Sequence, residues 1–465
     1  MSSSLDLDLS SYDHVHFIGI GGISMSGLAE VLMYNNHKVS GSDIQSSSIT
    51  KKLEADGGKI YIGHSKDNIE ETTKLVVYTA AVKSDNEELI RAKELNIPII
   101  ERAPFLGYIM KQYKKSIAVA GTHGKTTTTS MISVILEEAR VDPTILVGGE
   151  LDAIGGNVKV GNSPYFITEA CEYVESFLHF SPYIGIILNI EEDHLDYFTD
   201  IEHIKKAFYK FAKLVPKNGY LLAKGDSENV HSILKDLDCN ISTFGLSEDC
   251  HWQAINIGYN EFGFGYFDVL YRGKHFGHFQ LSVPGLHNVV NSLSAIGCAY
   301  YLDIPIDIIK SGLLAYRGTH RRFELKGKIQ DITVIDDYAH HPTEIKATLE
   351  AAKRYPHKKM WCVFQPHTYT RTITLLKEFS TAFEMADEII IADIFAAREK
   401  DTGLIHSKDL TKAITDTGKN AYYLGDFQSI VTFLLENIAP GDMVLTMGAG
   451  NINQVGSLLL IELAK

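Results

Sequence analysis

Short apolar runs alternate with longer segments in which apolar residues recur every three or four positions, along most of the chain. A short apolar run is typical of a strand buried on both faces, and a period of three to four is typical of an amphipathic helix. Such pairs occur at 14–34, 116–136 and 165–214. The pattern predicts an α/β protein with mostly parallel sheets.

Two breaks in this pattern predict three domains. A polar, basic tract at 110–115 ends the first module, and a third module with further strand-like runs begins near Gly318. Between 251 and 283, aromatic and polar residues alternate among glycines, which predicts antiparallel hairpins added to a parallel sheet. We expect an N-terminal Rossmann-like domain at 1–112, a central P-loop ATPase-type domain at 113–317 and a C-terminal Rossmann-like domain at 318–465.

Composition and charge narrow the class of protein. The net charge of −14 argues against nucleic acid as a partner, because neutralising phosphates requires clustered Lys and Arg. No apolar run reaches the roughly eighteen residues of a membrane span, so we expect no membrane insertion. The N-terminus does not have the pattern of a secretory signal, and the five scattered cysteines form no disulfide or zinc pattern. These features favour a cytoplasmic protein.

The glycine loop GTHGKTTT at 121–128 carries the strongest chemical signal. It lies between an apolar run and a helix-period segment, which is the context of a phosphate-binding loop. Gly121 and Gly124 let backbone N–H groups point at phosphate oxygens, Lys125 can reach the β- and γ-phosphates, and Thr126 can ligate Mg²⁺. Val119 stands where a full Walker A motif has its first glycine. The loop predicts ATP binding, with an ordinary glycine-rich turn as the alternative.

A second glycine turn, GIGGISMSG at 19–27, is similar to a dinucleotide fingerprint. Asp43 follows at the end of the next predicted strand, where NAD enzymes place a ribose-binding acid. Ser24 stands at the position of the third fingerprint glycine. Three interpretations stay open on these residues: a nicotinamide or flavin, another nucleotide or diphosphate, or a purely structural turn.

Ionisable and amide residues follow other predicted strands. Glu169 and His194 should reach the same sheet edge as the phosphate loop, where they can hold a second Mg²⁺; a solvated acidic loop is the alternative. Asn288 and Asn291 lie on one helical face and suit a ribose, an adenine or a phosphate, with a helix cap as the alternative for Asn288. Gly318 lies beside three arginines, and this pattern indicates a hinge that carries an anion-binding clamp. For Arg317 and Arg321 the alternative is a solvated basic loop.

With these residues in order, the chain resembles the Mur ligase family over nearly its whole length. The resemblance rests on HFIGIGGISMSGLAEVL (16–32), AGTHGKTTTTSM (120–131), EACEYVESFLHFSP (169–182), LNIEEDHLDYF (188–198), GLHNVVNSLSAI (285–296), YRGTHRRFE (316–324), DDYAHHPTEI (336–345) and FQPHTYTRT (364–372). Their order and spacing fit the family. The motifs are most similar to those of members that join L-alanine to UDP-N-acetylmuramate.

The resemblance implies an ATP-dependent ligase of peptidoglycan synthesis, and hence of cell wall biogenesis, cell shape and cell division. Such an enzyme forms an amide between the lactyl carboxylate of UDP-N-acetylmuramate and L-alanine through an acyl phosphate. It uses ATP and two Mg²⁺, binds these small-molecule substrates, and exists as a monomer or homodimer. The catalytic residues implied are Lys125, Glu169, His194, Arg322 and Asp337.

The family's ligand-binding residues map onto this chain in three groups. ATP would be held by Gly121, Thr122, His123, Gly124, Lys125, Thr126, Thr127, Asn288, Asn291, Arg322 and Asp337, and the metals by Thr126, Glu169 and His194. The UDP end of the substrate would be held by Gly21, Gly22, Ser24 and Asp43. The incoming amino acid would meet Tyr338, His340 and Arg371.

Two departures from the family pattern leave alternatives open. Alanine ligases are expected to carry H-R-Y-T-R, but Thr368 replaces the first arginine, so one carboxylate clamp is lost or replaced. Cys171 stands where many members have aspartate, and the carbamoylated-lysine role of some members is not assigned to Lys206. A related ligase that adds a peptide, such as a murein tripeptide recycling ligase, or another amino acid is therefore the alternative. A Rossmann dehydrogenase would leave several of the motifs unexplained. A non-catalytic nucleotide-binding regulator is an alternative only if the crevice lacks metal ligands.

Overall fold

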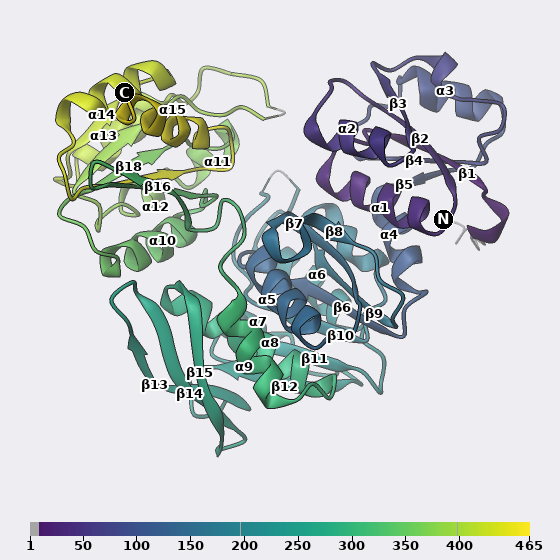
Figure 1. Cartoon of the computed structure of the whole chain (residues 1–465), viewed down its shortest axis with the longest axis horizontal. Helices are drawn as coiled ribbons and strands as arrows, with labels where there is room; N and C mark the ends of the chain where they lie inside the picture. Colours follow the sequence, from purple (N-terminus) through teal and green to yellow (C-terminus); the bar gives the residue numbers. More distant parts are fainter. Residues whose placement is uncertain (1–8, 196, 398) are drawn as a thin grey trace.

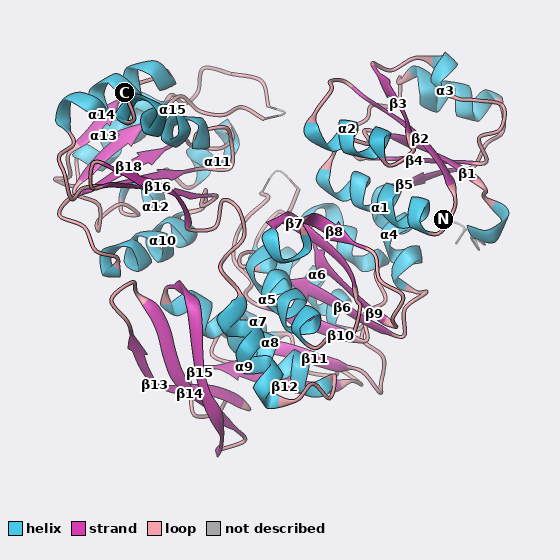
Figure 2. Cartoon of the chain, in the orientation of Figure 1, coloured by secondary structure: helices cyan, strands magenta, loops and turns pink. Residues whose placement is uncertain are grey.

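The computed structural model describes residues 9–195, 197–397 and 399–465, so Asp196 of the acidic motif lies outside the described residues. Within these ranges the strands form three sheets, of five, ten and six strands. Each sheet forms the centre of a separate body along the chain, coloured purple, blue to teal, and green to yellow in Figure 1. The α/β class and the mostly parallel sheets are confirmed (Figure 2).

The N-terminal sheet has the order β3-β2-β1-β4-β5, and all of its neighbouring strands are parallel. Its strands are β1 (His14–Ile18), β2 (Lys38–Asp43), β3 (Lys59–Ile62), β4 (Leu75–Tyr78) and β5 (Ile99–Glu101). The helices are α1 (Ile23–Tyr34), α2 (Ser48–Ala55), α3 (Glu87–Glu94) and α4 (Arg102–Met110). This strand order is that of an open, doubly wound sheet in which β1 ends at the centre, next to the glycine turn.

The central sheet has the order β15-β14-β13-β12-β11-β10-β6-β9-β7-β8. Its parallel part is β6 (Lys115–Ala120), β7 (Thr144–Leu151), β9 (Tyr165–Ala170), β10 (Ile184–Ile187), β11 (Tyr220–Lys224) and β12 (Asn240–Gly245). The antiparallel hairpins expected between 251 and 283 are β13 (Trp252–Tyr259), β14 (Phe264–Tyr271) and β15 (Lys274–Pro284). At the opposite edge, β8 (Gly156–Lys159) is antiparallel to β7.

Helices cover both faces of the central sheet. One face packs against α5 (Lys125–Glu138), α8 (Leu286–Tyr301) and α9 (Ile306–Ala315). The other packs against α6 (Ile201–Ala212), α7 (Glu228–Ser232), the 3₁₀ segment Tyr173–His179 and α4 of the N-terminal body. Neighbouring strands β10, β6 and β9 are in register at Ile187, Ala120 and Ala170. Their carboxyl ends therefore meet at one edge of the sheet, where parallel α/β folds place ligands.

The C-terminal sheet has the order β16-β17-β21-β18-β19-β20. The strand-like runs of the third module correspond to β17 (Ile332–Asp337), β18 (Met360–Phe364), β19 (Glu388–Ile391), β20 (Ala421–Tyr423) and β21 (Met443–Met447), which are all parallel. An antiparallel edge strand with alternating lysines, β16 (Glu324–Ile329), was not predicted from the sequence. The helices are α10 (Pro342–Arg354), α11 (Tyr369–Thr374), α12 (Leu376–Ser380), α13 (Ser407–Thr415), α14 (Phe427–Asn437) and α15 (Asn453–Leu463).

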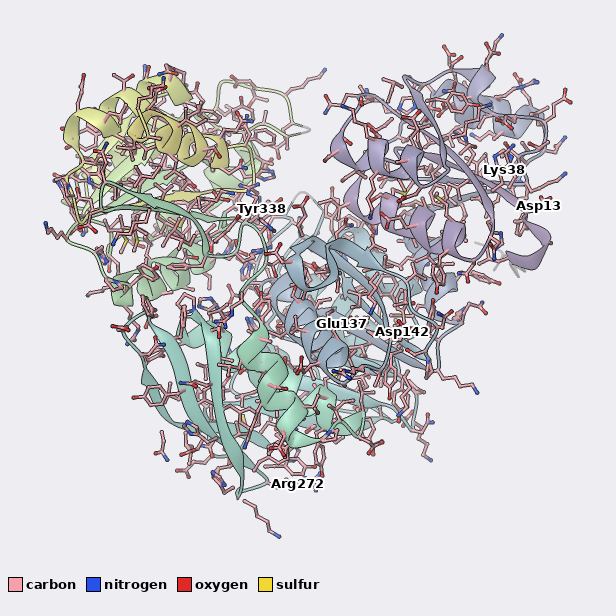
Figure 3. The ribbon with its side chains drawn as sticks, viewed as in Figure 1. Asp13, Lys38, Glu137, Asp142, Arg272 and Tyr338 are labelled. Atoms are coloured by element: carbon pink, nitrogen blue, oxygen red, sulfur yellow. The ribbon has the colours of Figure 1, made fainter. Side chains whose placement is uncertain are left out.

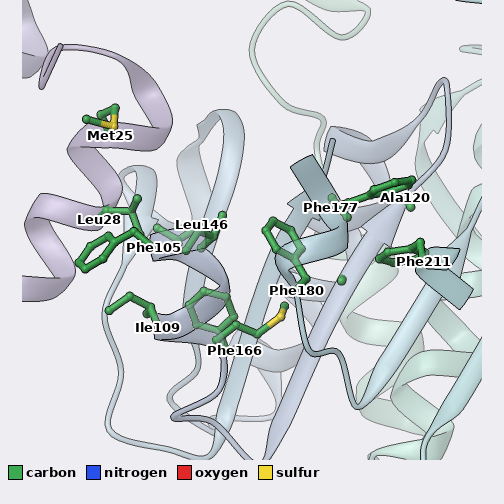
Figure 4. Close-up of a cluster of buried hydrophobic side chains, with 14 of the residues drawn as sticks. Met25, Leu28, Phe105, Ile109, Ala120, Leu146, Phe166, Phe177, Phe180 and Phe211 are labelled. Atoms are coloured by element: carbon green, nitrogen blue, oxygen red, sulfur yellow. The ribbon is translucent and has the colours of Figure 1, made fainter. Parts of the chain in front are cut away.

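Helix α1 joins the N-terminal body to the central body through an apolar contact. Met25 and Leu28 of α1 belong to the same buried cluster as Leu146 of β7 and Phe105 of α4 (Figure 4). Gly27 makes this approach possible, because a Cβ at this position would lie 2.7 Å from Cδ2 of Leu146. No helix among the described residues has both the length and the apolar character needed to cross a membrane.

Candidate active site

The phosphate-type loop connects the buried strand β6 to the start of α5. Gly121 has φ +145° and Gly124 has φ +82°, and both values favour glycine. A Cβ on Gly121 would also lie 2.9 Å from Cβ of Leu188, so a side chain is excluded there. The predicted strand–loop–helix arrangement is confirmed, and the loop presents the N-terminus of a fourteen-residue helix at the ligand-facing sheet edge.

Lys125 is folded toward its own loop and toward a buried carboxylate. Its Nζ donates to the carbonyl oxygen of Thr122 at 3.1 Å and lies 2.9 Å from Oε2 of Glu172, which is 3% exposed. Burial disfavours the ammonium, but Glu172 outweighs this effect and the pKa of Lys125 is raised. Glu172 is not among the residues expected from the sequence to form the site. Its position within the EACEY motif is a signal that was available.

Thr126 and Glu169 lie together beside this lysine. The Thr126 hydroxyl donates to Oε2 of Glu169 at 3.0 Å, and the N–H of Gly148 donates to Oε1 of the same carboxylate at 2.6 Å. His194 lies close by, with Nε2 3.8 Å from Oε1 of Glu172 and its ring 4.8 Å from that of Tyr173. The structure therefore brings Thr126 and Glu169 into contact, and it connects His194 to this pair through Glu172 and Lys125. A hydroxyl, a carboxylate and a borderline imidazole fit Mg²⁺, which prefers oxygen ligands.

A cavity of about 370 Å³ opens on the helix side of the loop, between the central and C-terminal bodies. It is bordered by His123, Gly124, Thr127, Asn288, Asn291, Arg322 and Asp337, which all belong to the expected ATP set. The buried Oδ1 of Asn288 has no hydrogen-bond partner among the described residues, while its Nδ2 donates to the carbonyl of Pro284 at 2.7 Å. An unpaired buried acceptor on the wall of a cavity suits a ligand with N–H or O–H donors, such as an adenine or a ribose.

Asp337 and Arg322 line the C-terminal side of this cavity. Asp337 is almost fully buried and accepts hydrogen bonds from the N–H groups of Phe323 and Ala339 at 2.8 and 2.7 Å. Burial raises the pKa of Asp337 to about 6, although Arg322 acts in the opposite direction. The guanidinium of Arg322 lies 5.0 Å from the ring centre of Tyr338, a residue at the edge that faces the central body (Figure 3).

A second cavity, of about 500 Å³, is bordered by all three bodies. Ala81 comes from the N-terminal body, Cys171 and His194 from the central body, and Thr368 and Arg371 from the C-terminal body. Residues of the phosphate loop border the first cavity, and residues of the motif after β9 border the second.

Arg371 is held by a carboxylate from the central body. Its Nε and Nη2 donate to Oδ1 of Asp193 at 3.2 and 2.7 Å. Burial opposes ionisation of Asp193, but Arg371 lowers its pKa well below the usual range. Thr368, the departure from the family pattern, adopts φ +66° and ψ 145°, which is unusual for a β-branched residue. Its hydroxyl caps α11 by accepting from the N–H of Arg371 at 3.4 Å.

Tyr338 and His340 lie between β17 and α10, close to Arg371. The rings of His340 and His367 are 5.7 Å apart, and Nδ1–H of His340 donates to the carbonyl of Tyr338 at 2.9 Å. Burial lowers the pKa of His340 to about 4, so its imidazole is neutral at pH 7. The structure therefore connects His340 and Arg371 through His367 and places Tyr338 beside His340, but of the three expected residues only Arg371 borders the second cavity.

The first glycine turn connects β1 to α1. Oδ2 of Asp43 accepts from the N–H of Gly21 at 2.9 Å, and the Ser24 hydroxyl accepts from Nη1 of Arg102 at 3.0 Å. A Cβ on Gly21 would lie 2.8 Å from Oδ2 of Asp43. The turn thus brings Gly21 and Asp43 together, whereas Ser24 contacts Arg102, and part of the hydrogen-bonding capacity of Asp43 is used within the turn.

The linker at 316–323 is attached to both bodies. Gly318 has φ +106°, and the hydroxyl of the next residue, Thr319, donates to the hydroxyl of Ser130 in α5 at 2.9 Å. Arg321 donates to Asp336 and to the carbonyls of Gly448 and Gly450, so the solvated-loop interpretation is wrong for Arg321.

Lys206 is exposed on α6. The described cysteines are all free.

Sequence profiles of three Mur ligase domains match nearly the whole chain. The profile described as the Mur ligase family catalytic domain matches residues 14–114, the Mur ligase middle domain matches 119–299, and the Mur ligase glutamate ligase domain matches 321–450.

Curated relatives match over almost their full length. The UDP-N-acetylmuramate–L-alanine ligase of Acetivibrio thermocellus is 59% identical over 455 residues, which is 98% of this chain and 97% of the relative. The ligase of the same name from Caldanaerobacter subterraneus subsp. tengcongensis is 55% identical over 458 residues, which is 98% of this chain and 99% of the relative.

Solved structures agree with these matches. The UDP-N-acetylmuramate-alanine ligase of Thermotoga maritima superposes with a TM-score of 0.82 at 30% identity, covering 97% of this chain and 98% of that one. A murein peptide ligase from Psychrobacter arcticus superposes with a TM-score of 0.71 at 26% identity, covering 97% and 99%.

Proposed function

The chain belongs to the Mur ligase family, and we propose that it joins UDP-N-acetylmuramate to L-alanine in peptidoglycan precursor synthesis, converting ATP to ADP and phosphate. A carboxylate is a poor electrophile, so the lactyl carboxylate first attacks the γ-phosphorus of ATP and releases ADP. The alanine amine then attacks the resulting acyl phosphate, and phosphate leaves from the tetrahedral intermediate. Both steps concentrate negative charge on phosphoryl and acyl oxygens.

The first cavity takes the adenosine part of ATP in this proposal. The unpaired Oδ1 of Asn288 accepts a hydrogen bond from the nucleoside, and Asn291, Arg322 and Asp337 border the same space. The triphosphate then follows the N-terminus of α5, where the N–H groups after Gly121 and the ammonium of Lys125 meet it. Lys125 exchanges its contact with Glu172 for the transferring phosphoryl group.

Two Mg²⁺ ions complete this part of the site in the proposal, and they would neutralise charge on the phosphate oxygens. Thr126 and Glu169 would hold one ion, and Glu169 with His194 the other. Glu172 lies between Lys125 and His194, so it fixes the lysine and the histidine relative to each other.

The second cavity takes the reacting carboxylate and the amino acid. Arg371 supplies the positive charge for the carboxylate of L-alanine, and Asp193 holds its guanidinium in place. Tyr338 and the neutral His340 lie near Arg371. Since Thr368 contributes no charge, the chain uses one arginine where the family pattern has two. The UDP part of the substrate lies along the first glycine turn, at Gly21, Gly22, Ser24 and Asp43.

The proposal rests on one observation above all. Lys125 and Thr126 belong to the loop that borders the first cavity, Thr126 contacts Glu169, and Glu172 links Lys125 to His194, which borders the second cavity with Arg371. Phosphate release tests it, using UDP-N-acetylmuramate, ATP and Mg²⁺ with L-alanine, L-serine, glycine or the murein tripeptide. We expect release that requires both the muramoyl substrate and L-alanine. Phosphate release without the muramoyl substrate, or faster phosphate release with the tripeptide than with L-alanine, would contradict the proposal.

A further inference from the structure

Three potential metal ligands converge where the central and C-terminal bodies meet, outside the Thr126–Glu169–His194 set. His123 lies in the phosphate loop, Glu191 follows β10, and His341 precedes α10. Their ligand atoms all lie within 4.8 Å of one another. The rings of His123 and His341 are 4.7 Å apart. Two ligands thus come from the central body and one from the C-terminal body.

One imidazole nitrogen at this junction lacks a partner among the described residues. Nε2 of His341 is buried and forms no hydrogen bond there, and His341 is only 6% exposed. Nε2 of His123 is also buried, and it lies 3.4 Å from Oε2 of Glu191 without forming a regular hydrogen bond. Buried polar atoms in native structures usually have partners, so this arrangement calls for a physical explanation.

Carboxylates orient the cluster as they do around bound metals. Nδ1 of His123 lies 3.1 Å from Oε1 of Glu344, which directs Nε2 of the same ring toward Oε2 of Glu191 at 3.4 Å. A carboxylate on the far nitrogen of an imidazole fixes its tautomer and increases its basicity as a ligand. The Thr343 hydroxyl donates to Oε2 of Glu191 at 2.8 Å and so positions the third ligand.

We propose that His123, Glu191 and His341 form a binding site for a divalent transition-metal cation of the Zn²⁺ or Co²⁺ type, which bridges the central and C-terminal domains. Two imidazoles and one carboxylate favour such cations, whereas Mg²⁺ prefers oxygen ligands. Bonds of about 2.0–2.1 Å place tetrahedral ligands roughly 3.3 Å apart, so the cluster contracts by about 1.5 Å at most on binding.

Two rearrangements accompany binding. Nδ1 of His341 accepts from the N–H of Thr343 at 3.3 Å, and this long capping bond is lost when the ring takes the Nδ1–H tautomer. Nε2 of His123 and Oε2 of Glu191, which face each other at 3.4 Å, both turn toward the cation. Glu344 and His341 both face the imidazole ring of His123. The bound cation opposes separation of the two domains.

His341→Asn tests the site in the full chain, because asparagine is a good helix N-cap and the start of α10 is retained. Thr343→Val is the matched control, since it removes the hydrogen bond between the domains but leaves all three ligands. Zn²⁺ binding is measured by competition with a chromophoric chelator under saturating Mg²⁺, which fills the oxygen-rich sites. Co²⁺ absorption reports the coordination, and thermal unfolding verifies the fold of each variant.

We expect the wild type and Thr343→Val to bind one more tight equivalent of Zn²⁺ than His341→Asn, or to bind it more than about 100-fold more tightly. The Co²⁺ d–d bands should weaken in His341→Asn alone. Equal binding in the wild type and His341→Asn would overturn the proposal, and the cluster would then be a hydrogen-bonded contact only. An equal loss of Zn²⁺ binding in both variants would also overturn the proposal, because the loss would then follow from weaker contact between the domains and not from a missing ligand. Neither readout depends on the ligase reaction.

Discussion

The ammonium of Lys125 lies 2.9 Å from Oε2 of Glu172, a carboxylate that is almost completely buried. The pair links the phosphate loop after β6 to the segment after the neighbouring strand β9. It keeps the lysine charged in a buried place and close to His194, where the proposed phosphoryl transfer takes place.

Replacing Lys125 by alanine should lower kcat by roughly 10²–10³ or more, because a preorganised positive charge at the transferring phosphoryl group is lost. Steady-state phosphate release measures the effect, and circular dichroism verifies the fold. The exposed Lys114 provides the control, and Lys114→Ala should behave as wild type. Near-normal turnover of the Lys125 variant would show that this lysine does not contact the reacting phosphate.

Glu169→Gln should weaken the apparent affinity for Mg²⁺ by about 10–100-fold. The amide keeps the shape of the side chain but loses the charge that the proposal assigns to both metal ions. A Mg²⁺ titration at saturating substrates measures the shift. Glu150→Gln changes an exposed residue on the neighbouring β7 and should leave the titration unchanged. Identical titrations for both variants would remove Glu169 from the metal site.

Arg371→Lys should raise KM for L-alanine by about 10–100-fold and leave KM for ATP within about twofold of the wild type. The lysine keeps the charge but loses the planar guanidinium that Asp193 orients, and a charged hydrogen bond contributes roughly 1.5–3 kcal/mol. Initial rates with each substrate varied in turn separate the two constants. Arg354→Lys, at the C-terminal end of α10, is the control. An equal rise in both constants would point to a general disturbance of the site.

The pH dependence of kcat/KM for ATP should contain the ionisation of Asp337. Burial raises the pKa of this carboxyl to about 6, so it is neutral below pH 6 and charged above. If the charged form accepts hydrogen bonds from the nucleotide, kcat/KM rises as pH increases through about 6. Asp337→Asn cannot ionise, so this ascending limb should disappear. A limb that persisted in the variant would belong to another group.

Gly27→Val should destabilise the chain by about 1–3 kcal/mol, because a Cβ would lie 2.7 Å from Leu146 and 2.9 Å from Val158. Denaturant unfolding measures the loss. The double variant Gly27→Ala with Leu146→Ala should show positive coupling relative to the sum of the two single changes. Additive changes in the free energy of unfolding would mean that α1 does not pack against β7 as closely as the structure indicates.

Local patterns in the sequence predicted much of the fold. The strands β6, β9 and β17 are buried runs without charged interruptions over most of their length, so their existence and type follow from composition. The hairpins at 251–283 follow from the alternating pattern. The edge strand β16 was missed because its lysines and glycine resemble a polar loop, and only pairing with β17 stabilises it.

The sequence by itself determined the phosphate loop, the three-module organisation and the set of candidate residues, because each depends on neighbours within one strand–loop–helix unit. The tertiary structure alone decided which of these residues meet. Lys125 pairs with a residue 47 positions away, and Arg371 with one 178 positions away. Such pairings depend on strand order, on register and on backbone turns such as the positive φ at His194. Side-chain direction beyond a strand end is set by these long-range constraints, which no local pattern encodes.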